Sequence, residues 1–209
     1  MSAHAPRSAT TIVIGGSAGA LDVVVDLLSS LPAGFGPAIL ICLHLHPEDG
    51  GRLVEDLRQR TKLPVVEAQD KMVIVGGQVH VATADYHLLV ERTGTLALSR
   101  DAKVNFCRPS IDVLFDSAAR AYGNTLVALL LSGANRDGAA GMSRVRARGG
   151  LTLAQAPETA VSPEMPRAAI EDGAVAQVLT PQNLRDLLFR LHSTPTQEVV
   201  VCPPGSIGS

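Results

Sequence analysis

The sequence is poor in aromatic residues and contains no tryptophan. Aromatic side chains make up 3% of the 209 residues, whereas hydrophobic residues as a class make up 46%. The core must therefore consist mainly of alanine, valine, leucine and isoleucine, which is typical of a parallel sheet covered by helices. A chain of this length suits a single domain with a substantial core.

Paired cysteines, long apolar segments and runs of basic charge are also missing. Cys42, Cys107 and Cys202 have no metal-type spacing, and an odd number of cysteines argues against a disulfide framework. No uncharged apolar run reaches the roughly 18 residues that a membrane span needs, and residues 1–9 lack the apolar centre of a signal peptide. The net charge of −2 argues against a nucleic-acid surface. We therefore expect a cytoplasmic protein that does not bind nucleic acid and does not insert into membranes.

The most informative stretch runs from Thr10 to Leu31. A β-branched apolar run is followed by GGSAG and then by apolar residues at helical spacing, which predicts a strand, a tight turn and a helix. Ser17 lies in the middle of the turn, where glycines permit a sharp reversal that holds the hydroxyl above the sheet edge. This pattern suits a nucleophile, but a phosphate-binding turn or a turn that serves packing alone shares it. A dinucleotide-binding turn fits poorly, because serine replaces the middle glycine and the next strand ends in histidines.

The rest of the chain alternates between short apolar runs and amphipathic segments. Buried strands are predicted at 38–43, 63–68, 126–131, 151–154 and 175–179. Helices are predicted at 51–61, from Ile111 with Ser110 as its cap, at 139–147 and 165–171, and from Pro181 with Thr180 as its cap.

Residues 71–99 have a different pattern, in which short strands are joined by tight turns. We interpret them as an antiparallel insert on one edge of the main sheet. The predicted fold is a single doubly wound, Rossmann-like α/β domain over residues 10–192, with a mostly parallel sheet flanked by helices. Residues 1–9 and 193–209 are expected to be tails.

Three predicted strand ends carry side chains suited to acyl transfer. Ser17, His44 and Asp137 each follow a buried strand, and the carboxyl ends of parallel strands meet at one rim of a sheet. Acyl transfer needs a hydroxyl nucleophile, an imidazole base and a carboxylate that orients the imidazole. The three residues therefore form a candidate triad, although their chain order differs from that of α/β-hydrolases.

Each member of the triad also has another interpretation. His44 suits a structural histidine, and His46 is an equal rival for the base if the strand continues. His44 and His46 with Glu48 or Asp49 form a candidate metal site, because His-x-His is a known ligand spacing. Asp137 is typical of a residue that begins a helix. Residue patterns alone leave these alternatives open.

Six ordered blocks between Ile12 and Leu188 resemble the catalytic domain of the chemotaxis protein-glutamate methylesterases (CheB type). The blocks are IVIGGSAGA, LHLHP, VHVATADYHLLVE, RPSIDVLF, LLLSGANRDGAAGM and MPRAAIEDGAVAQVL. The resemblance implies that Ser17 is the nucleophile, His44 the general base and Asp137 the third member of the triad.

The resemblance also places an oxyanion-stabilising backbone amide at Ala134. Gly16 and Ala18 are expected to belong to the same oxyanion and substrate region. The candidate neighbours of the site are His46, Asn135 and Met165.

The implied activity is hydrolysis of glutamate methyl esters on the cytoplasmic helices of methyl-accepting chemoreceptors, with release of methanol. Deamidation of receptor glutamines is implied for some members, and neither a metal nor a cofactor is expected. Family members usually carry an N-terminal receiver domain, but only about ten residues precede the first predicted strand here. We therefore expect no receiver domain in this chain, which is then a stand-alone esterase, a fragment of a longer protein or a member that serves another sensory pathway. A separate receiver or regulator protein is a candidate partner. The alternatives are another ester or amide substrate, or a non-catalytic receptor-binding module.

Overall fold

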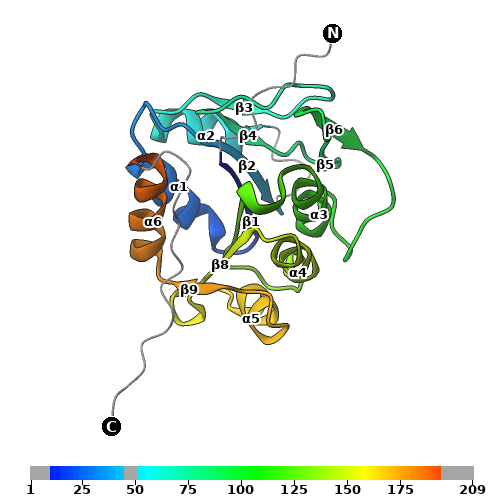
Figure 1. The fold of residues 1–209 in the computed structure, drawn as a ribbon, viewed down its shortest axis with the longest axis vertical. Coiled ribbons are helices and arrows are strands. Elements are labelled where there is room, and N and C mark those ends of the chain that lie inside the picture. Colours follow the sequence, from blue (N-terminus) through cyan, green and yellow to red (C-terminus); the bar gives the residue numbers. More distant parts are fainter. Residues whose placement is uncertain (1–9, 45–50, 194–209) are drawn as a thin grey trace.

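The computed structural model describes residues 10–44 and 51–193. In these ranges a seven-stranded parallel sheet has helices on both faces, and a separate two-stranded antiparallel sheet lies to one side (Figure 1). The predicted doubly wound α/β fold is confirmed. None of the described helices combines the length and the apolar character that crossing a membrane would require.

The elements alternate along most of the chain. The strands are β1 (Thr11–Gly16), β2 (Ala38–Leu43), β3 (Val65–Glu67), β4 (Val79–Val81), β5 (His87–Val90), β6 (Leu96–Ser99), β7 (Leu126–Leu130), β8 (Leu151–Gln155) and β9 (Gln177–Leu179). The helices are α1 (Ala20–Ser30), α2 (Arg52–Arg60), α3 (Ile111–Tyr122), α4 (Ala139–Ala147), α5 (Glu164–Glu171) and α6 (Pro181–Ser193), with short 3₁₀ turns η2 (Gly123–Thr125) and η3 (Pro157–Thr159).

The two faces of the sheet have separate hydrophobic cores, because successive side chains of a strand point to opposite faces. Ile12 and Ile14 of β1 pack with residues of α1, α2 and α6. Val13 packs on the other face with residues of α3, α4 and α5. In β2, Leu40 and Cys42 belong to this second face. Both cores are mainly aliphatic, as the composition predicts, and each contains one buried phenylalanine, Phe35 or Phe115.

The strand order is β3-β4-β2-β1-β7-β8-β9, which places β1 at the centre of the sheet. From β1 the chain first adds strands on one side, and it later returns to add β7 on the other side. The carboxyl ends of β1 and β7 therefore form the point where the winding direction reverses. Ligands bind at this point in open α/β sheets.

The interpretation of residues 71–99 needs one correction. Val79–Val81 does not belong to an antiparallel insert, because it pairs in parallel with β2 and β3 inside the main sheet. The antiparallel strand pair consists of β5 and β6, packed against α3, and an isolated antiparallel bridge joins Val73 to Thr95. A strand of three residues is too short for its periodicity to identify its partner. The expected tails lie outside the described residues, apart from Ser193.

Candidate active site

Backbone hydrogen bonds join the strand ends at the rim. The N–H of Ser17 donates to the carbonyl of Ser132 at 2.8 Å, and the N–H of His44 donates to the carbonyl of Gly16 at 3.1 Å. The turn after β1 therefore lies between the end of β2 and the loop that follows β7. The fold brings the three predicted strand ends together.

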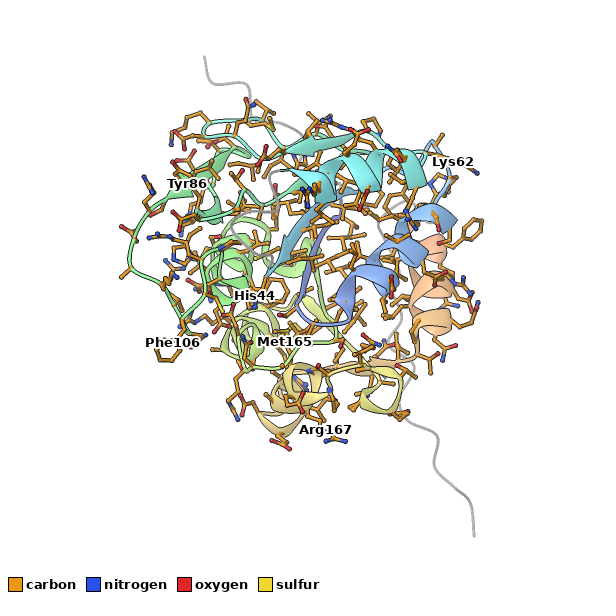
Figure 2. All side chains as sticks on the ribbon, turned by 180° about the vertical axis from the view of Figure 1, so that it is seen from behind. His44, Lys62, Tyr86, Phe106, Met165 and Arg167 are labelled. Atoms are coloured by element: carbon orange, nitrogen blue, oxygen red, sulfur yellow. The ribbon has the colours of Figure 1, made fainter. Side chains whose placement is uncertain are left out.

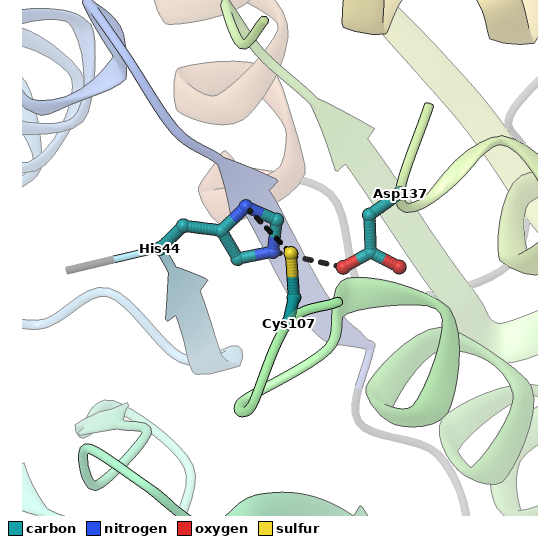
Figure 3. A group of neighbouring side chains, drawn as sticks. All are labelled: His44, Cys107 and Asp137. Carbon is teal, nitrogen blue, oxygen red and sulfur yellow. Dashed lines mark hydrogen bonds and ion pairs between the residues drawn. The ribbon is translucent and has the colours of Figure 1, made fainter. Parts of the chain in front are cut away.

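His44 and Asp137 form a close pair at this rim. Nε2 of His44 lies 2.8 Å from Oδ2 of Asp137 (Figure 3). The carboxylate is fully buried, whereas the imidazole keeps 13% of its side-chain surface exposed. Because the carboxylate accepts a hydrogen bond from Nε2–H, it favours the tautomer that has its lone pair on Nδ1.

Four donors besides the imidazole surround the carboxylate of Asp137. They are Asn105 Nδ2 at 2.9 Å, Ser110 Oγ at 2.8 Å, and the backbone N–H groups of Ile111 at 2.7 Å and Asp112 at 3.3 Å. Burial alone would raise the pKa of Asp137, but the hydrogen bonds together lower this pKa below its ordinary value. Asp137 is therefore a fixed negative charge at neutral pH.

The helices α3 and α4 exchange their capping carboxylates. Asp137 immediately precedes the start of α4 but accepts from the first N–H groups of α3. Asp112 lies in the first turn of α3 and accepts from the N–H groups of Gly138 at 3.0 Å and Gly141 at 2.6 Å. Asn105 Nδ2 donates to both carboxylates. Burial, with the nearby charge of Asp137, raises the pKa of Asp112. The exchange ties both helices to the site.

This arrangement refines two expected helix caps. Ser110 occupies the N-cap position of α3, as predicted, but its hydroxyl donates to Asp137 and does not cap the backbone. Asp137 does not begin α4, because Gly138 is the N-cap there. The sequence pattern identifies residues beside a helix start but not which helix they serve.

The turn that carries Ser17 is held by close packing. Gly19, the N-cap of α1, has a φ of 78°, and a Cβ at this position would lie 2.4 Å from the Cβ of Val161. A Cβ on Gly16 would lie 2.5 Å from that of Ala20. Both positions therefore require glycine. Ser17 is half-buried, and its hydroxyl has no hydrogen bond to any other described residue.

The predicted oxyanion residues differ in whether they are exposed at the site with a free backbone N–H group. Ala134 and Ala18 are exposed, and no acceptor in the described ranges pairs with their backbone N–H groups. Such N–H groups are suited to stabilising an oxyanion. Gly16, in contrast, is buried at the end of β1, and its carbonyl accepts from His44.

Asn135 and Met165 lie beside the loop that follows β7. Oδ1 of Asn135 accepts from the N–H of Asp137 at 3.0 Å, and its Nδ2 lies 3.6 Å from Cys107 Sγ. The N–H of Met165 donates to the carbonyl of Gly133 at 2.9 Å. Figure 2 labels Met165 and His44 on this part of the molecule. Both predicted neighbours therefore adjoin the loop of Asp137.

Cys107 is a neighbour that the sequence analysis did not assign to the site. Its Sγ lies 3.7 Å from Nδ1 of His44 (Figure 3), and one ligand atom from each of Cys107, His44 and Asp137 lies within 4.8 Å of the others. The available signal was its position just before the block RPSIDVLF. The metal site considered from the sequence cannot be compared, because residues 46–49 lie outside the described ranges.

Comparison with known proteins identifies the family. The sequence model of the CheB methylesterase family matches residues 12–188. The chain belongs to the CheB methylesterase family. This confirms the resemblance carried by the six sequence blocks.

This CheB-family chain matches one relative over nearly its whole length and another over about half of its length. It is 41% identical over 187 residues to a Leptospira interrogans protein named as a candidate protein-glutamate methylesterase/protein-glutamine glutaminase, covering 90% of this chain and 97% of the relative. It is 39% identical over 182 residues to the Pseudomonas aeruginosa protein-glutamate methylesterase/protein-glutamine glutaminase 2, covering 86% of this chain. The match spans 52% of the length of the Pseudomonas protein.

A solved structure supports the same assignment. The crystal structure of the Thermotoga maritima CheB methylesterase catalytic domain matches with a TM-score of 0.84 and 31% identity. The match covers 88% of this chain and 99% of the Thermotoga domain. The fold of the CheB-family chain is therefore that of the catalytic domain.

Proposed function

We propose that this chain is a serine hydrolase that demethylates glutamate methyl esters of chemoreceptors and releases methanol, with Ser17, His44 and Asp137 as its triad. The observation that carries the proposal is the 2.8 Å contact between His44 and the buried carboxylate of Asp137, at the rim that also holds Ser17. The names of the relatives supply the reaction.

The first half of the reaction transfers the acyl group to the protein. Ser17 Oγ attacks the ester carbonyl while Nδ1 of His44 takes its proton, since Nε2 faces Asp137. The negative charge of Asp137 stabilises the imidazolium that forms. His44 then gives its proton to the departing methoxy group, and methanol leaves.

The second half repeats the sequence with water. His44 deprotonates the water, which attacks the ester on Ser17, and the serine is regenerated with a free glutamate product. The unpaired N–H groups of Ala134 and Ala18 are the proposed donors to the oxyanion in both halves. A receptor glutamine presents the same acyl carbon with ammonia as the leaving group, so we include deamidation as a second reaction.

The proposed partners follow from the proposed substrate. A receptor helix that carries methylated glutamates would dock at the rim, which requires the chain to work in the cytoplasm. A separate receiver or regulator protein is the proposed means of control. The residues around the site supply the chemistry, and no step uses a cofactor.

The test is methanol release from methylated chemoreceptor membranes, measured for the wild type and for folded Ser17→Ala. We expect release from the wild type and loss of at least a thousandfold in the variant. Hydrolysis of small esters without release from receptors would instead favour another substrate. Receptor binding without hydrolysis of any ester would favour a non-catalytic binding module.

A further inference from the structure

Cys107 and His44 are spaced as two ligands of one metal ion. Sγ of Cys107 lies 3.7 Å from Nδ1 of His44. A tetrahedral zinc ion bound to a thiolate at about 2.3 Å and an imidazole at about 2.05 Å holds these two atoms about 3.6 Å apart. The separation of the two atoms therefore matches that of two ligands on one zinc ion.

The other nitrogen of His44 is arranged as in protein zinc sites. Ligating histidines usually donate their second ring N–H to a carboxylate, which fixes the ring and increases the basicity of the ligating nitrogen. Nε2 of His44 makes this bond to Asp137 at 2.8 Å. Asp137 needs no rearrangement to support the ion, because its remaining donors stay in place.

Two polar groups lie beside the sulfur of Cys107, whose thiol donates to the carbonyl of Asn105 at 3.3 Å. Asn135 Nδ2 lies 3.6 Å from Sγ and can donate to a thiolate. A zinc ion displaces the thiol proton as it binds.

We infer that Cys107 and His44 bind a zinc ion through Sγ and Nδ1, with water at the remaining positions, and that this ion inhibits the hydrolase. Binding releases the thiol proton to solvent and involves no change of oxidation state. Inhibition follows because zinc occupies the lone pair that would accept the proton of Ser17. The inhibitory role rests on the proposed function, whereas the binding of zinc does not.

Cobalt(II) alone provides a direct probe of binding, because a thiolate bound to cobalt absorbs in the near ultraviolet. We expect a band that saturates at one cobalt per chain and that one equivalent of zinc removes. Cys107→Ser and Cys107→Ala should abolish the band, and His44→Gln should weaken cobalt binding at least tenfold. Cys42→Ala and Cys202→Ser are the matched thiol controls and should keep it. A band that persists without Cys107, or no band in the folded wild type at millimolar cobalt, would overturn the inference.

Inhibition is tested by methanol release with and without zinc. The wild type should lose activity with zinc and regain it with a chelator. Cys107→Ser, normalised to its own metal-free rate, should need at least tenfold more zinc for half inhibition. Equal zinc sensitivity would refute the inhibitory role. If no form releases methanol, the proposed function fails, while the cobalt band still decides whether the metal site exists.

Discussion

The two strand-to-helix connections that meet at the rim are built in opposite ways. The turn after β1 holds Ser17 between Gly16 and Gly19, which are packed against neighbouring side chains, and the hydroxyl has no partner among the described residues. The loop after β7 holds Asp137, which is fully buried and accepts hydrogen bonds from the imidazole and four further donors. Within the described residues, the Ser17 hydroxyl is unpaired, whereas the Asp137 carboxylate accepts five hydrogen bonds.

This difference matches the two tasks in acyl transfer. A nucleophile exchanges its bonding partners in every turnover, whereas an orienting carboxylate must keep its partners throughout. In the first connection, backbone geometry positions the residue without constraining the hydroxyl. In the loop after β7, a network of hydrogen bonds fixes the position of the negatively charged Asp137 carboxylate. Substitutions in the two connections and in the neighbouring Asp112 should therefore have different effects on activity and stability.

The largest effect is expected from Ser17→Ala. Methanol release should fall about 10⁴-fold, because the proposed nucleophile is lost. The free energy of unfolding should change by less than about 0.5 kcal/mol, since the hydroxyl makes no hydrogen bond in the described structure. Kinetic assay and urea denaturation provide both values. Ser29→Ala, at an exposed helix end, is the control that should leave activity intact. A strongly destabilised Ser17→Ala would mean that the hydroxyl is structural.

Asp137→Asn should affect both activity and stability. The amide NH₂ would face groups that are themselves donors, so we expect a loss of about 10³-fold in activity and about 2–4 kcal/mol in the free energy of unfolding. Asp112→Asn is the matched change in the neighbouring carboxylate. It should cost less in both measurements, because Asp112 does not contact the imidazole. Equal activity losses in the two variants would show that helix capping, not orientation of His44, explains the role of Asp137.

Gly19→Ala tests the packed turn. The positive φ and the contact with Val161 should together lower the free energy of unfolding by about 1–3 kcal/mol. Gly34→Ala is the control, because a Cβ there would meet no atom within 4 Å. Thermal denaturation of the two variants gives the comparison. Equal melting temperatures would contradict the tight packing described for the turn.

The smallest expected effect is the change with pH in the contribution of Asp112 to the free energy of unfolding. Its raised folded pKa means that the folded protein binds this proton more tightly than the unfolded chain. Its contribution to stability is therefore present below the unfolded pKa of about 3.9 and is lost as pH rises through the folded pKa. The lowered pKa of Asp137 acts in the opposite sense, with stability lost only as pH falls below about 3.9.

We therefore expect the stability of Asp112→Asn relative to the wild type to increase as the pH rises above about 3.9. Urea denaturation at several pH values measures the difference. A difference that stays constant as the pH rises would contradict the raised pKa.

Much of this arrangement could be predicted from the sequence. Strand ends with functional side chains fall at one rim in any doubly wound sheet, so Ser17, His44 and Asp137 could be selected together. The exchange of caps could not be predicted, because it joins Asp112 to an N–H that is 26 positions away in sequence. Cys107 was missed for the same reason. Its partner is 63 positions away, and no local spacing connects the two residues.

In the fold, too, some strands could be predicted from their own residues, whereas the partners of another could not. Residues of β1 and β2 form continuous apolar runs, which predicts strands buried on both faces. The three residues of β4 carry too little pattern to choose between a main-sheet strand and an antiparallel insert. Its place beside β2 is fixed by packing across the sheet rather than by its own sequence.

The central claim is that the His44–Asp137 pair activates Ser17. The most direct test is labelling with a fluorophosphonate, followed by mass spectrometry to locate the adduct. We predict one adduct, on the peptide that contains Ser17, and its loss in His44→Ala. An adduct on Cys107, or labelling of Ser17 that is unchanged without His44, would contradict the account.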